Sequence, residues 1–428
     1  MRVTRLALLV ALCGAMLFGL TAVEALAQET GGEAVRGTIT RETEEGEKES
    51  VAGVDIVVQT ADGQEIGTAT TDDEGRYELE LPGPGDYQAT IQEDTLPQGV
   101  QLTNPDRATL EFTIAQGQSR PLLYPLGEAE ARGSQFFRSL LQLFVEGIKF
   151  GLIIAMTAVG LSLIFGTTGL VNFAHGELVT FGALAAHFFN VTLGVHLIPA
   201  AILAIIVGGL AAGALDRGLW KPLRGRGTGL IAMLVISIGL SLVLRYVYLI
   251  YFGGRTAPFA QYSVQQSLVI AGVRVTPKDL IGVGLSILVL VGVALVLQRT
   301  KIGKAMRAVS DNRDLAESSG INVERVILFV WVFGGALATL GGVLLGLDQQ
   351  VSWQMGFQLL LLMFAGVILG GLGTAYGALL GSLVVGIFIQ TSTLVISPEL
   401  KNVGALFVLI LILLVRPQGL LGQRERVG

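Results

Sequence analysis

Gly160-Leu-Ser-Leu-Ile-Phe-Gly-Thr-Thr-Gly-Leu-Val-Asn-Phe-Ala-His-Gly-Glu177 joins an apolar run to three polar side chains, Asn172, His175 and Glu177, before apolar sequence resumes. Polar groups at membrane depth are costly, so they usually face the protein interior or a water-filled path. The glycines beside them predict an interrupted helix, which lipid tolerates only where the backbone lines a cavity. The stretch therefore predicts a membrane protein with an internal polar pathway, rather than a simple membrane anchor.

Composition indicates two parts with different solvents. Hydrophobic residues make up 51% of the 428 residues, charged residues only 15%, and there are 57 glycines, which is typical of closely packed membrane helices. Residues 28–133 hold 22 acidic and 7 basic side chains, whereas residues 134–428 hold 11 acidic and 20 basic. We therefore expect an acidic, water-soluble domain followed by a basic, apolar membrane domain.

Residues 1–27 have the features of a signal peptide. Arg2 and Arg5 precede an apolar core over residues 6–20, and Ala25-Leu-Ala27 provides the small residues of a cleavage site. An uncleaved membrane anchor is the alternative. Either interpretation places the following domain outside the cytoplasm.

Residues 28–124 are predicted to form a small all-β sandwich. Apolar and polar residues alternate in short runs such as Arg76-Tyr-Glu-Leu-Glu-Leu81, and turn residues separate the runs. The string Thr70-Thr-Asp-Asp-Glu-Gly-Arg-Tyr77, followed by Leu81-Pro-Gly-Pro-Gly-Asp-Tyr87, resembles the carboxypeptidase regulatory-like (prealbumin-like) domain family. Domains of that family are generally non-catalytic, which implies an interaction or spacing module.

Residues 138–428, which follow a linker at 125–137, are predicted to be a mainly α, polytopic helix bundle with about eight or nine membrane spans. A helix needs roughly 20 residues to cross the hydrocarbon core. The runs at 178–190 and 357–370 are shorter, so each is expected to be a half-helix or a re-entrant segment. The apolar runs occupy residues 141–166, 178–190, 196–215, 229–252, 279–297, 326–346, 357–370, 374–396 and 402–415.

The distribution of basic residues predicts the orientation. Short cytoplasmic loops attract Lys and Arg, and nine spans from an outside N-terminus put three basic clusters on one side, at 217–226, 299–325 and 416–426. The signal peptide gives the same orientation independently. We therefore expect a multi-pass protein of the cytoplasmic membrane, with its N-terminal domain outside and its C-terminus in the cytoplasm.

A second glycine break is predicted at Gly370-Gly-Leu-Gly373, between two apolar runs, and it has a counterpart in Gly166-Thr-Thr-Gly169. Short, glycine-interrupted segments in corresponding places of two halves point to a central pathway. Other glycines, such as Gly377 and Gly381, recur at a spacing that lets helix backbones approach closely. Packing is their expected role.

The loop at 299–322 is predicted to dock a cytoplasmic partner. Residues 303–318 can form one short helix with Ala305, Val309 and Ala316 on its apolar face, and Gly320 is a natural helix stop. The alternative is a basic surface helix against lipid headgroups. The length and mixed charge of the loop favour docking.

Five motifs in order across residues 138–424 together resemble the LivH-type permease of branched-chain amino acid ABC importers. The closing Arg416-Pro-Gln-Gly-Leu-Leu-Gly422 is also similar to that family's ending. The five motifs are Asn172-Phe-Ala-His-Gly-Glu177, Gly303-Lys-Ala-Met-Arg-Ala308, Glu317-Ser-Ser-Gly-Ile-Asn322, Gly341-Gly-Val-Leu-Leu-Gly346 and Gly366-Val-Ile-Leu-Gly-Gly-Leu-Gly373.

The resemblance implies a pairing with a second, LivM-like permease, two cytoplasmic ABC ATPases that bind ATP and Mg, and a periplasmic substrate-binding protein. Two departures from the family pattern stand out. The β-sandwich is additional to the usual short LivH chain, and a lysine expected before the Gly-Leu-Gly segment is replaced by Leu359-Leu-Leu-Leu362.

The resemblance and the residue chemistry together imply two functional regions. The translocation pathway and its gate would be shaped, near the cytoplasmic side, by Asn172, His175, Glu177, Gly370, Gly371 and Gly373. The ATPase-coupling segment would include Gly303, Arg307, Asp311, Glu317 and Gly320.

Four other polar residues have plainer expected roles. His187 and His196 are too isolated for a metal site, and we expect no metal, cofactor or nucleic acid bound by this chain. Arg245 is expected to snorkel from the outer end of its helix. Asp348 is expected on the extracytoplasmic side of the membrane, either as a contact for the binding protein or as an ordinary loop acid. His175 itself is expected to be a neutral, hydrogen-bonded histidine.

The energy source and the substrate distinguish the remaining alternatives. The chain has no G-x-x-x-x-G-K-[ST] loop, because Gly303-Lys304 is followed by Ala305, so energy comes from partner ATPases or from an ion gradient. An ion-coupled secondary transporter would need intramembrane carboxylates, and Glu177 is the candidate near a break.

Within the ABC interpretation, branched-chain amino acids are favoured over urea, short amides and other amino acids. A membrane enzyme and an adhesion protein are disfavoured, since no catalytic set is present and the helices are broken.

Overall fold

The computed structural model describes residues 33–42, 48–97, 100–102, 108–115, 119–127, 132–262, 265–371, 373–396, 400 and 410. The chain divides into two compact units, with the division between Ser134 and Gln135. The predicted signal peptide and the basic cluster at 416–426 lie outside the described residues, as does the apolar run at 402–415 apart from Ile410.

The N-terminal unit is a small β-sheet domain, as predicted. Two four-stranded sheets, in the orders β5-β4-β7-β9 and β3-β2-β11-β8, and a three-stranded sheet, β10-β1-β6, surround one apolar core. The strands are β1 (Ala34–Thr38), β2 (Thr40–Glu42), β3 (Lys48–Ser50), β4 (Asp55–Thr60), β5 (Glu65–Thr70), β6 (Arg76–Glu80), β7 (Gly85–Ile91), β8 (Gln101–Leu102), β9 (Thr109–Ile114), β10 (Ser119–Pro121) and β11 (Pro125–Gly127).

Alternation of apolar and polar residues explains how these strands pack. Ile56 and Val58 of β4 are fully buried, while every second residue points away from the core. Two tyrosine hydrogen bonds hold the segment between β10 and β11 against the sheets, because the Tyr77 hydroxyl donates to the Leu122 carbonyl at 3.1 Å and the Tyr124 hydroxyl donates to the Ala89 carbonyl at 2.7 Å. Burial raises the pKa of both tyrosines above the ordinary value, so both keep their donating protons under physiological conditions.

The second unit is helical. Its elements are α2 (Arg132–Thr168), α3 (His175–His187), the π-helical turn η3 (Phe188–Thr192), α4 (Leu197–Leu215), the π-helical turn η4 (Asp216–Trp220), α5 (Lys221–Gly225), α6 (Leu230–Phe252), the hairpin strands β12 (Leu268–Ile270) and β13 (Val273–Val275), α7 (Pro277–Arg299), α8 (Lys301–Asp311), α9 (Arg313–Ser318), α10 (Val323–Gln349), α11 (Met355–Gly370) and α12 (Ala375–Ser392).

Six helical stretches within the described residues are long and apolar enough to cross a membrane. They are Phe136–Thr168, Leu197–Gly225, Leu230–Phe252, Pro277–Arg299, Val323–Gln349 and Ala375–Ser392. The two runs that were predicted to be short form α3, with 13 residues, and α11, with 16 residues. Neither reaches the roughly 20 residues of a full crossing. The unit is therefore a multi-pass membrane bundle that contains two short helices, and the exact span count stays a prediction.

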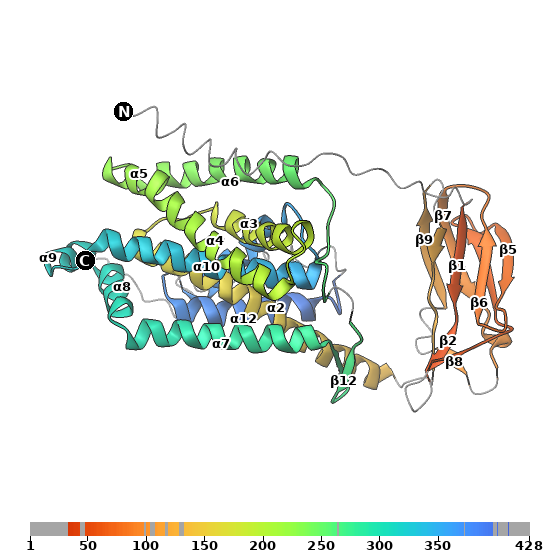
Figure 1. The fold of residues 1–428 in the computed structure, drawn as a ribbon. Helices are drawn as coiled ribbons and strands as arrows, with labels where there is room; N and C mark the ends of the chain where they lie inside the picture. The colour runs from red at the N-terminus through yellow and green to blue at the C-terminus, as the bar shows by residue number, and fades with distance from the viewer. Residues whose placement is uncertain are drawn as a thin grey trace. The chain divides into compact units, whose positions relative to one another are not determined.

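Helix α10 occupies the centre of the bundle, where it packs against both α3 and α4 (Figure 1). Helices α6 and α7 instead carry large exposed apolar side chains along much of their length, among them Ile231, Val243 and Leu288. Such continuous apolar surface marks contact with lipid or with another membrane subunit.

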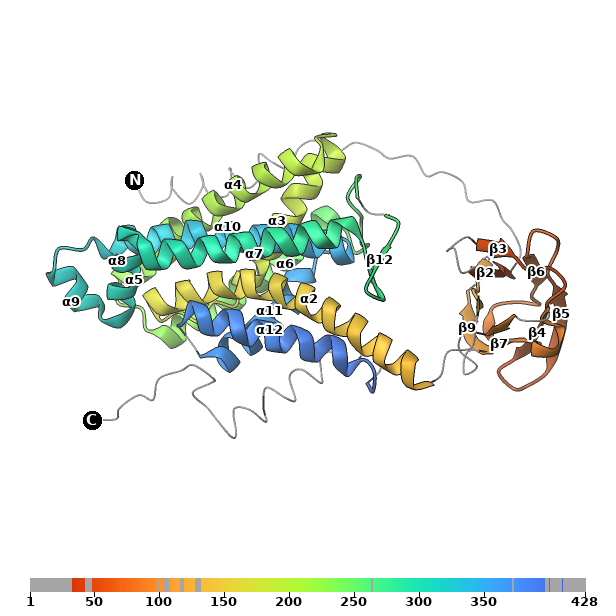
Figure 2. The ribbon, with the colours of Figure 1, turned by 90° about the horizontal axis from the view of Figure 1, so that it is seen from below.

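The two ends of the bundle differ in character. Helices α5, α8 and α9 gather at one end, and the β12–β13 hairpin lies at the other (Figures 1 and 2). The predicted basic clusters at 217–226 and 299–325 belong to these three helices and their flanks. Both clusters therefore occupy the same end, which is what the charge-based orientation requires.

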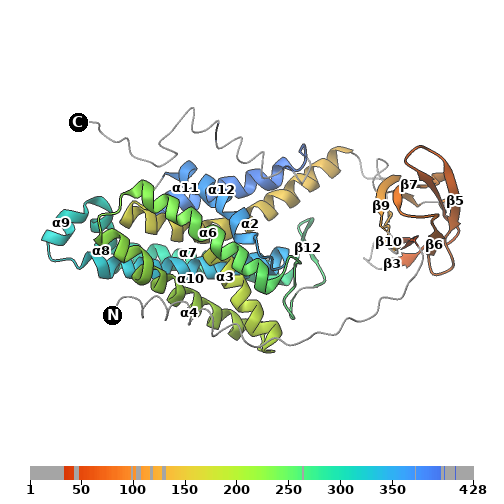
Figure 3. The same cartoon turned by 90° about the horizontal axis from the view of Figure 1, so that it is seen from above.

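Helices α11 and α12 pack through facing glycines and lie side by side in Figures 2 and 3. A Cβ atom on Gly377 would overlap the carbonyl oxygen of Gly370, and one on Gly381 would overlap that of Gly366. These contacts show that the glycines predicted to serve packing do so, because only a hydrogen side chain permits the backbones to come this close.

Gly377→Ala is expected to lower the stability of the detergent-solubilised protein by about 1–3 kcal/mol, because the added methyl forces α11 and α12 apart. Thermal unfolding measures the effect. The matched control is Gly239→Ala in α6, where nothing lies within 4 Å of the added Cβ, and it is expected to be neutral or stabilising. Equal stability of the two variants would contradict the packing role.

Candidate functional site

The polar motif at 172–177 forms the turn that leads from α2 into α3. Gly169 adopts a left-handed conformation, with φ +69°, which lets the chain reverse after α2. The Asn172 Oδ1 accepts from the Ala174 N–H at 3.1 Å, and the Phe173 N–H donates to the Ser237 Oγ of α6 at 3.1 Å. Asn172 thus shapes the turn, and Ser237 fixes it to a neighbouring helix.

His175 begins α3 and is completely buried. Its Nε2 donates to the Thr157 carbonyl of α2 at 3.2 Å, so the histidine is hydrogen-bonded as expected. Thr157 precedes the end of α2 at Thr168 by 11 residues, about 16 Å along the helix. The first turn of α3 therefore lies about one third of the way back along the apolar stretch Phe136–Thr168 of α2. The position of this motif near the cytoplasmic side stays a prediction, and the structure adds that the chain returns into the bundle before α3 begins.

Glu177 is fully buried in the first turn of α3 and forms an ion pair. Its Oε1 accepts from the Ser241 Oγ at 2.9 Å and lies 3.5 Å from the Arg245 Nε, both on α6. The Tyr248 hydroxyl donates to the Glu177 backbone carbonyl at 3.2 Å. The second carboxylate oxygen, Oε2, has no hydrogen-bond partner among the described residues.

Arg245 does not snorkel to the outer surface, contrary to expectation. It lies two turns before the end of α6, its side chain is only 13% exposed, and it pairs with Glu177. The guanidinium also lies over the Phe357 ring of α11, 3.5 Å from the ring centroid, which is a cation–π contact. A buried charge at membrane depth is stabilised mainly by a partner, and Glu177 provides it.

The N-terminal ends of α3 and α11 meet at this ion pair. Gly176 and Gly356 are in backbone contact, and the Gly356 N–H donates to the Thr180 Oγ1 at 3.1 Å. Neither helix has a side-chain N-cap. Helix N-termini carry partial positive charge, so two such ends converge beside Glu177 and Arg245.

The predicted glycine break after α11 lies at a different level of the bundle. Gly370 ends α11, and Gly371 and Gly373 have φ +109° and +78°. Gly373 contacts Gly166 near the end of α2, so the two predicted breaks do meet. Gly370 lies 14 residues after Gly356, about 21 Å along α11. The six predicted pathway residues therefore form two groups, one at membrane depth and one near the end that carries α5, α8 and α9.

The predicted docking segment forms two helices, α8 and α9, instead of one helix over 303–318. Asn312 separates them because its backbone is extended and its Oδ1 accepts from the Leu315 N–H at 2.9 Å, which caps α9. Gly303 is buried against backbone carbonyls of the last turn of α7, so its role is to permit the tight turn into α8.

The other predicted coupling residues are available to a partner. Arg307, Asp311, Glu317 and Gly320 are exposed, and Gly320 ends α9 with φ +84°. Leu315, which the sequence motifs did not single out, is 64% exposed on α9 among these charges.

Asp348 lies near the opposite end of α10, where it takes part in an ion-pair network. Lys149 of α2 bridges Asp348 at 2.6 Å and Asp279 of α7 at 3.0 Å. Asp348 is thus neither an ordinary loop acid nor free for another protein, because it ties three helices together. No group of three His, Cys, Asp or Glu side chains within the described ranges could hold a metal ion.

Comparison with known proteins identifies the family. The family model described as branched-chain amino acid transport system / permease component matches residues 143–415. The chain belongs to this permease family. A carboxypeptidase regulatory-like domain model matches residues 34–115, which confirms the second predicted resemblance.

Individual relatives support the same assignment. The chain is 32% identical over 305 residues to the high-affinity branched-chain amino acid transport system permease protein BraD of Pseudomonas aeruginosa, a match covering 67% of this chain and 96% of BraD. It is 31% identical over 306 residues to the corresponding LivH protein of Escherichia coli, covering 68% and 98%. Two thirds of this chain thus match nearly the full length of these permeases, and the β-sheet domain lies in the remaining third.

The ion pair predicts a strong coupling between two substitutions. Arg245→Met is expected to destabilise the permease by about 3–5 kcal/mol, because it leaves the Glu177 carboxylate buried without a cation. The double variant Arg245→Met with Glu177→Gln is expected to recover most of that loss, as measured by thermal unfolding in detergent. Arg255→Met, at an exposed arginine in the loop after α6, is the matched control. Additive effects of the two buried substitutions would contradict the pairing.

Proposed function

We propose that this chain is a transmembrane subunit of an ATP-driven ABC importer that moves branched-chain or related amino acids across the cytoplasmic membrane. The observation that carries the proposal is the match of nearly the whole membrane unit to permeases of branched-chain amino acid transport systems. The chain acts as a transport subunit, and its relatives are permease subunits rather than enzymes.

The proposed assembly contains a second, LivM-like permease, two cytoplasmic ABC ATPases and a substrate-binding protein. The ATPases bind ATP and Mg, and this chain supplies the surface on which one of them docks. The exposed residues Arg307, Asp311, Glu317 and Gly320 form that surface, and Leu315 is its apolar contact. Gly303 positions it at the end of α7.

The proposed arrangement in the membrane follows from the sequence. Residues 1–27 direct the chain to the membrane, the β-sheet domain lies outside the cytoplasm, and the helical unit forms the permease with a cytoplasmic C-terminus. The linker expected at 125–137 is shorter than predicted, because β11 ends the β-sheet domain at Gly127 and α2 already begins at Arg132. The grouping of two basic clusters at one end of the bundle supports this orientation.

The pathway is proposed to pass the junction of α3 and α11. Asn172 and His175 fix the start of α3, and Glu177 pairs with Arg245 at that start. The two helix ends and the ion pair form a polar site inside the membrane, and the charges of the ion pair sum to zero. An amino acid with a neutral side chain is a zwitterion, so its carboxylate and ammonium group find complementary charge there without adding net charge to the membrane interior.

Gating is proposed to involve the second group of pathway residues. Gly370, Gly371 and Gly373 form a backbone break beside the end of α2, and a break of this kind permits α11 to move relative to α12. The contact of Gly373 with Gly166 supports a gate at the point where the two halves of the chain meet.

An ion-coupled secondary transporter is the weaker alternative. It would need a carboxylate free to bind the coupling ion, and Glu177 is already paired with Arg245. The same pair disfavours urea and short amides as substrates, because neither carries the opposite charges that would match it.

The proposed function is tested by purification and reconstitution. The chain is expected to co-purify with an ATPase and a second permease, and reconstituted vesicles are expected to take up leucine, isoleucine or valine only with ATP and the binding protein. Arg307→Glu is expected to reduce ATPase co-purification about tenfold or more, because it reverses a charge on the docking surface. Arg255→Glu, the same reversal at an exposed arginine outside that surface, is the control. Uptake by this chain alone without ATP would refute the proposal.

A further inference from the structure

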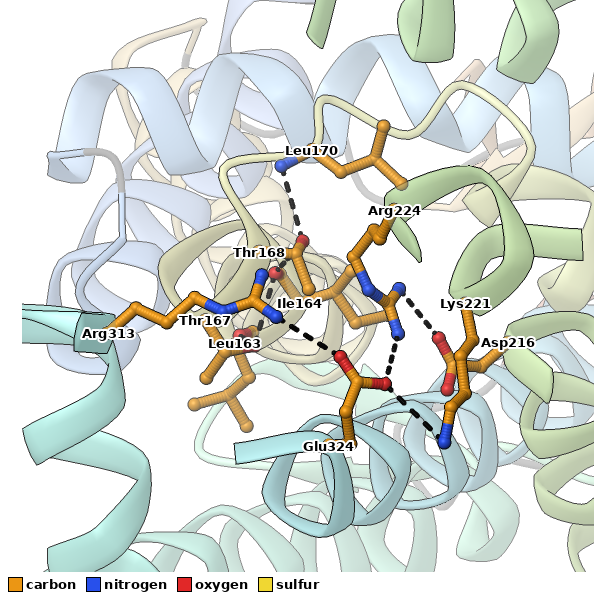
Figure 4. Close-up of polar contacts among 10 residues, drawn as sticks. All are labelled: Leu163, Ile164, Thr167, Thr168, Leu170, Asp216, Lys221, Arg224, Arg313 and Glu324. Carbon is orange, nitrogen blue, oxygen red and sulfur yellow. Dashed lines mark hydrogen bonds and ion pairs between the residues drawn. The ribbon is translucent and has the colours of Figure 1, made fainter. Parts of the chain in front are cut away.

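Glu324 joins three cations from two separate segments, as Figure 4 shows. It lies in the first turn of α10, where its Oε1 is 3.2 Å from an Arg313 nitrogen of α9. Its Oε2 lies 3.4 Å from Arg224 and 3.8 Å from Lys221, both in α5. The N-terminal end of α10 also favours a negative charge at this position.

The contact between α5 and the membrane helices is rigid. The Arg224 side chain is 6% exposed and donates to Asp216 at 2.8 Å, and Asp216 is 1% exposed. Trp220 stacks on Trp331 of α10, with ring centroids 5.9 Å apart. The buried, hydrogen-bonded ion pair therefore fixes α5 to η4, and the stacked tryptophan pair fixes η4 to α10.

The contact between α9 and Glu324, in contrast, is an exposed and weak ion pair. Arg313 and Glu324 are 42% and 33% exposed, and an exposed ion pair contributes only about 0–1 kcal/mol. When Arg313 leaves, Glu324 keeps Arg224 and Lys221 as partners, so no charge is left uncompensated. This ion pair can therefore open and close at little cost.

We propose that the Arg313–Glu324 ion pair transmits movement of the ATPase-docking segment to the transmembrane helices, with Glu324 as the positioning residue; this inference rests on the proposed function. Arg313 begins α9, the helix that carries Leu315 and Glu317 of the proposed docking surface, and it is not itself part of that surface. Glu324 lies in the first turn of α10, which packs along α3 and α4.

Helix α10 connects this contact to the pathway. Gly342 of α10 is in backbone contact with Val179 of α3, within one turn of Glu177, so a shift of α10 along its axis displaces the start of α3. Interiors packed this closely transmit displacement rather than absorb it. The Arg313–Glu324 contact therefore lies at one end of a continuous route to the Glu177–Arg245 ion pair.

The test compares import with ATP hydrolysis in the assembled transporter in vesicles. Arg313→Gln and Glu324→Gln are each expected to leave ATPase co-purification and the basal hydrolysis rate unchanged, but to raise the ATP consumed per amino acid imported about fivefold, as loss of a coupling contact of this size implies. Arg313→Lys is expected to restore most of the coupling, and the double variant is expected to be no worse than either single one. Arg217→Gln, at an exposed arginine of η4, is the matched control.

The outcomes separate the inference from the proposed function. Import and hydrolysis that fall in proportion, or an unchanged ratio in both Gln variants, would overturn the coupling role, and the exposed Arg313 variant keeps this test valid if Glu324→Gln fails to fold. Absence of ATP-dependent import by the unmodified assembly would instead refute the proposed function itself.

Discussion

The Glu177–Arg245 ion pair is the interaction on which the arrangement of the membrane unit depends. A carboxylate and a guanidinium buried at membrane depth must remain together, because either one alone would be an uncompensated charge. Their pairing holds the first turn of α3 against α6, and the contact of Arg245 with Phe357 adds the first turn of α11. Two short helices thus begin at one place inside the bundle, and we propose that substrate passes there.

We propose that the movement driven by ATP hydrolysis reaches the junction of α3 and α11 through α10. Its first turn carries Glu324, at the end of the bundle where the docking helices lie, and its later residue Gly342 contacts α3 directly. A single helix therefore spans the distance between the docking segment and the buried ion pair. The contacts around Arg224 are buried and fixed, whereas the contact at Arg313 is exposed and replaceable. The contact of α9 with α10 can therefore change while the buried contacts of α5 stay in place.

Much of the fold could be predicted from the sequence because local patterns encode it. Run length distinguished the short helices α3 and α11 from full spans, alternation identified the β-sheet domain, and polar residues beside glycines pointed to the buried junction. Long-range pairing could not be predicted. Arg245 follows Glu177 by 68 positions, and a lone arginine in an apolar helix resembles one that snorkels. The contact of His175 with Thr157 could not be predicted for the same reason, since only the folded chain brings the two residues together. The break at Asn312 was missed because the helical pattern continues across it.

The central claim, that a polar path passes the junction of α3 and α11, is tested most directly by thiol accessibility. The single cysteine, Cys13, lies in the predicted signal peptide, so one introduced cysteine can be followed alone. In the assembled transporter, Gln358→Cys, at an exposed position in the first turn of α11, is predicted to react with a small membrane-impermeant thiol reagent. Val243→Cys, on the exposed apolar face of α6, is predicted to remain unmodified in lipid. An unreactive Gln358→Cys variant, or equal reaction at both positions, would contradict the claim.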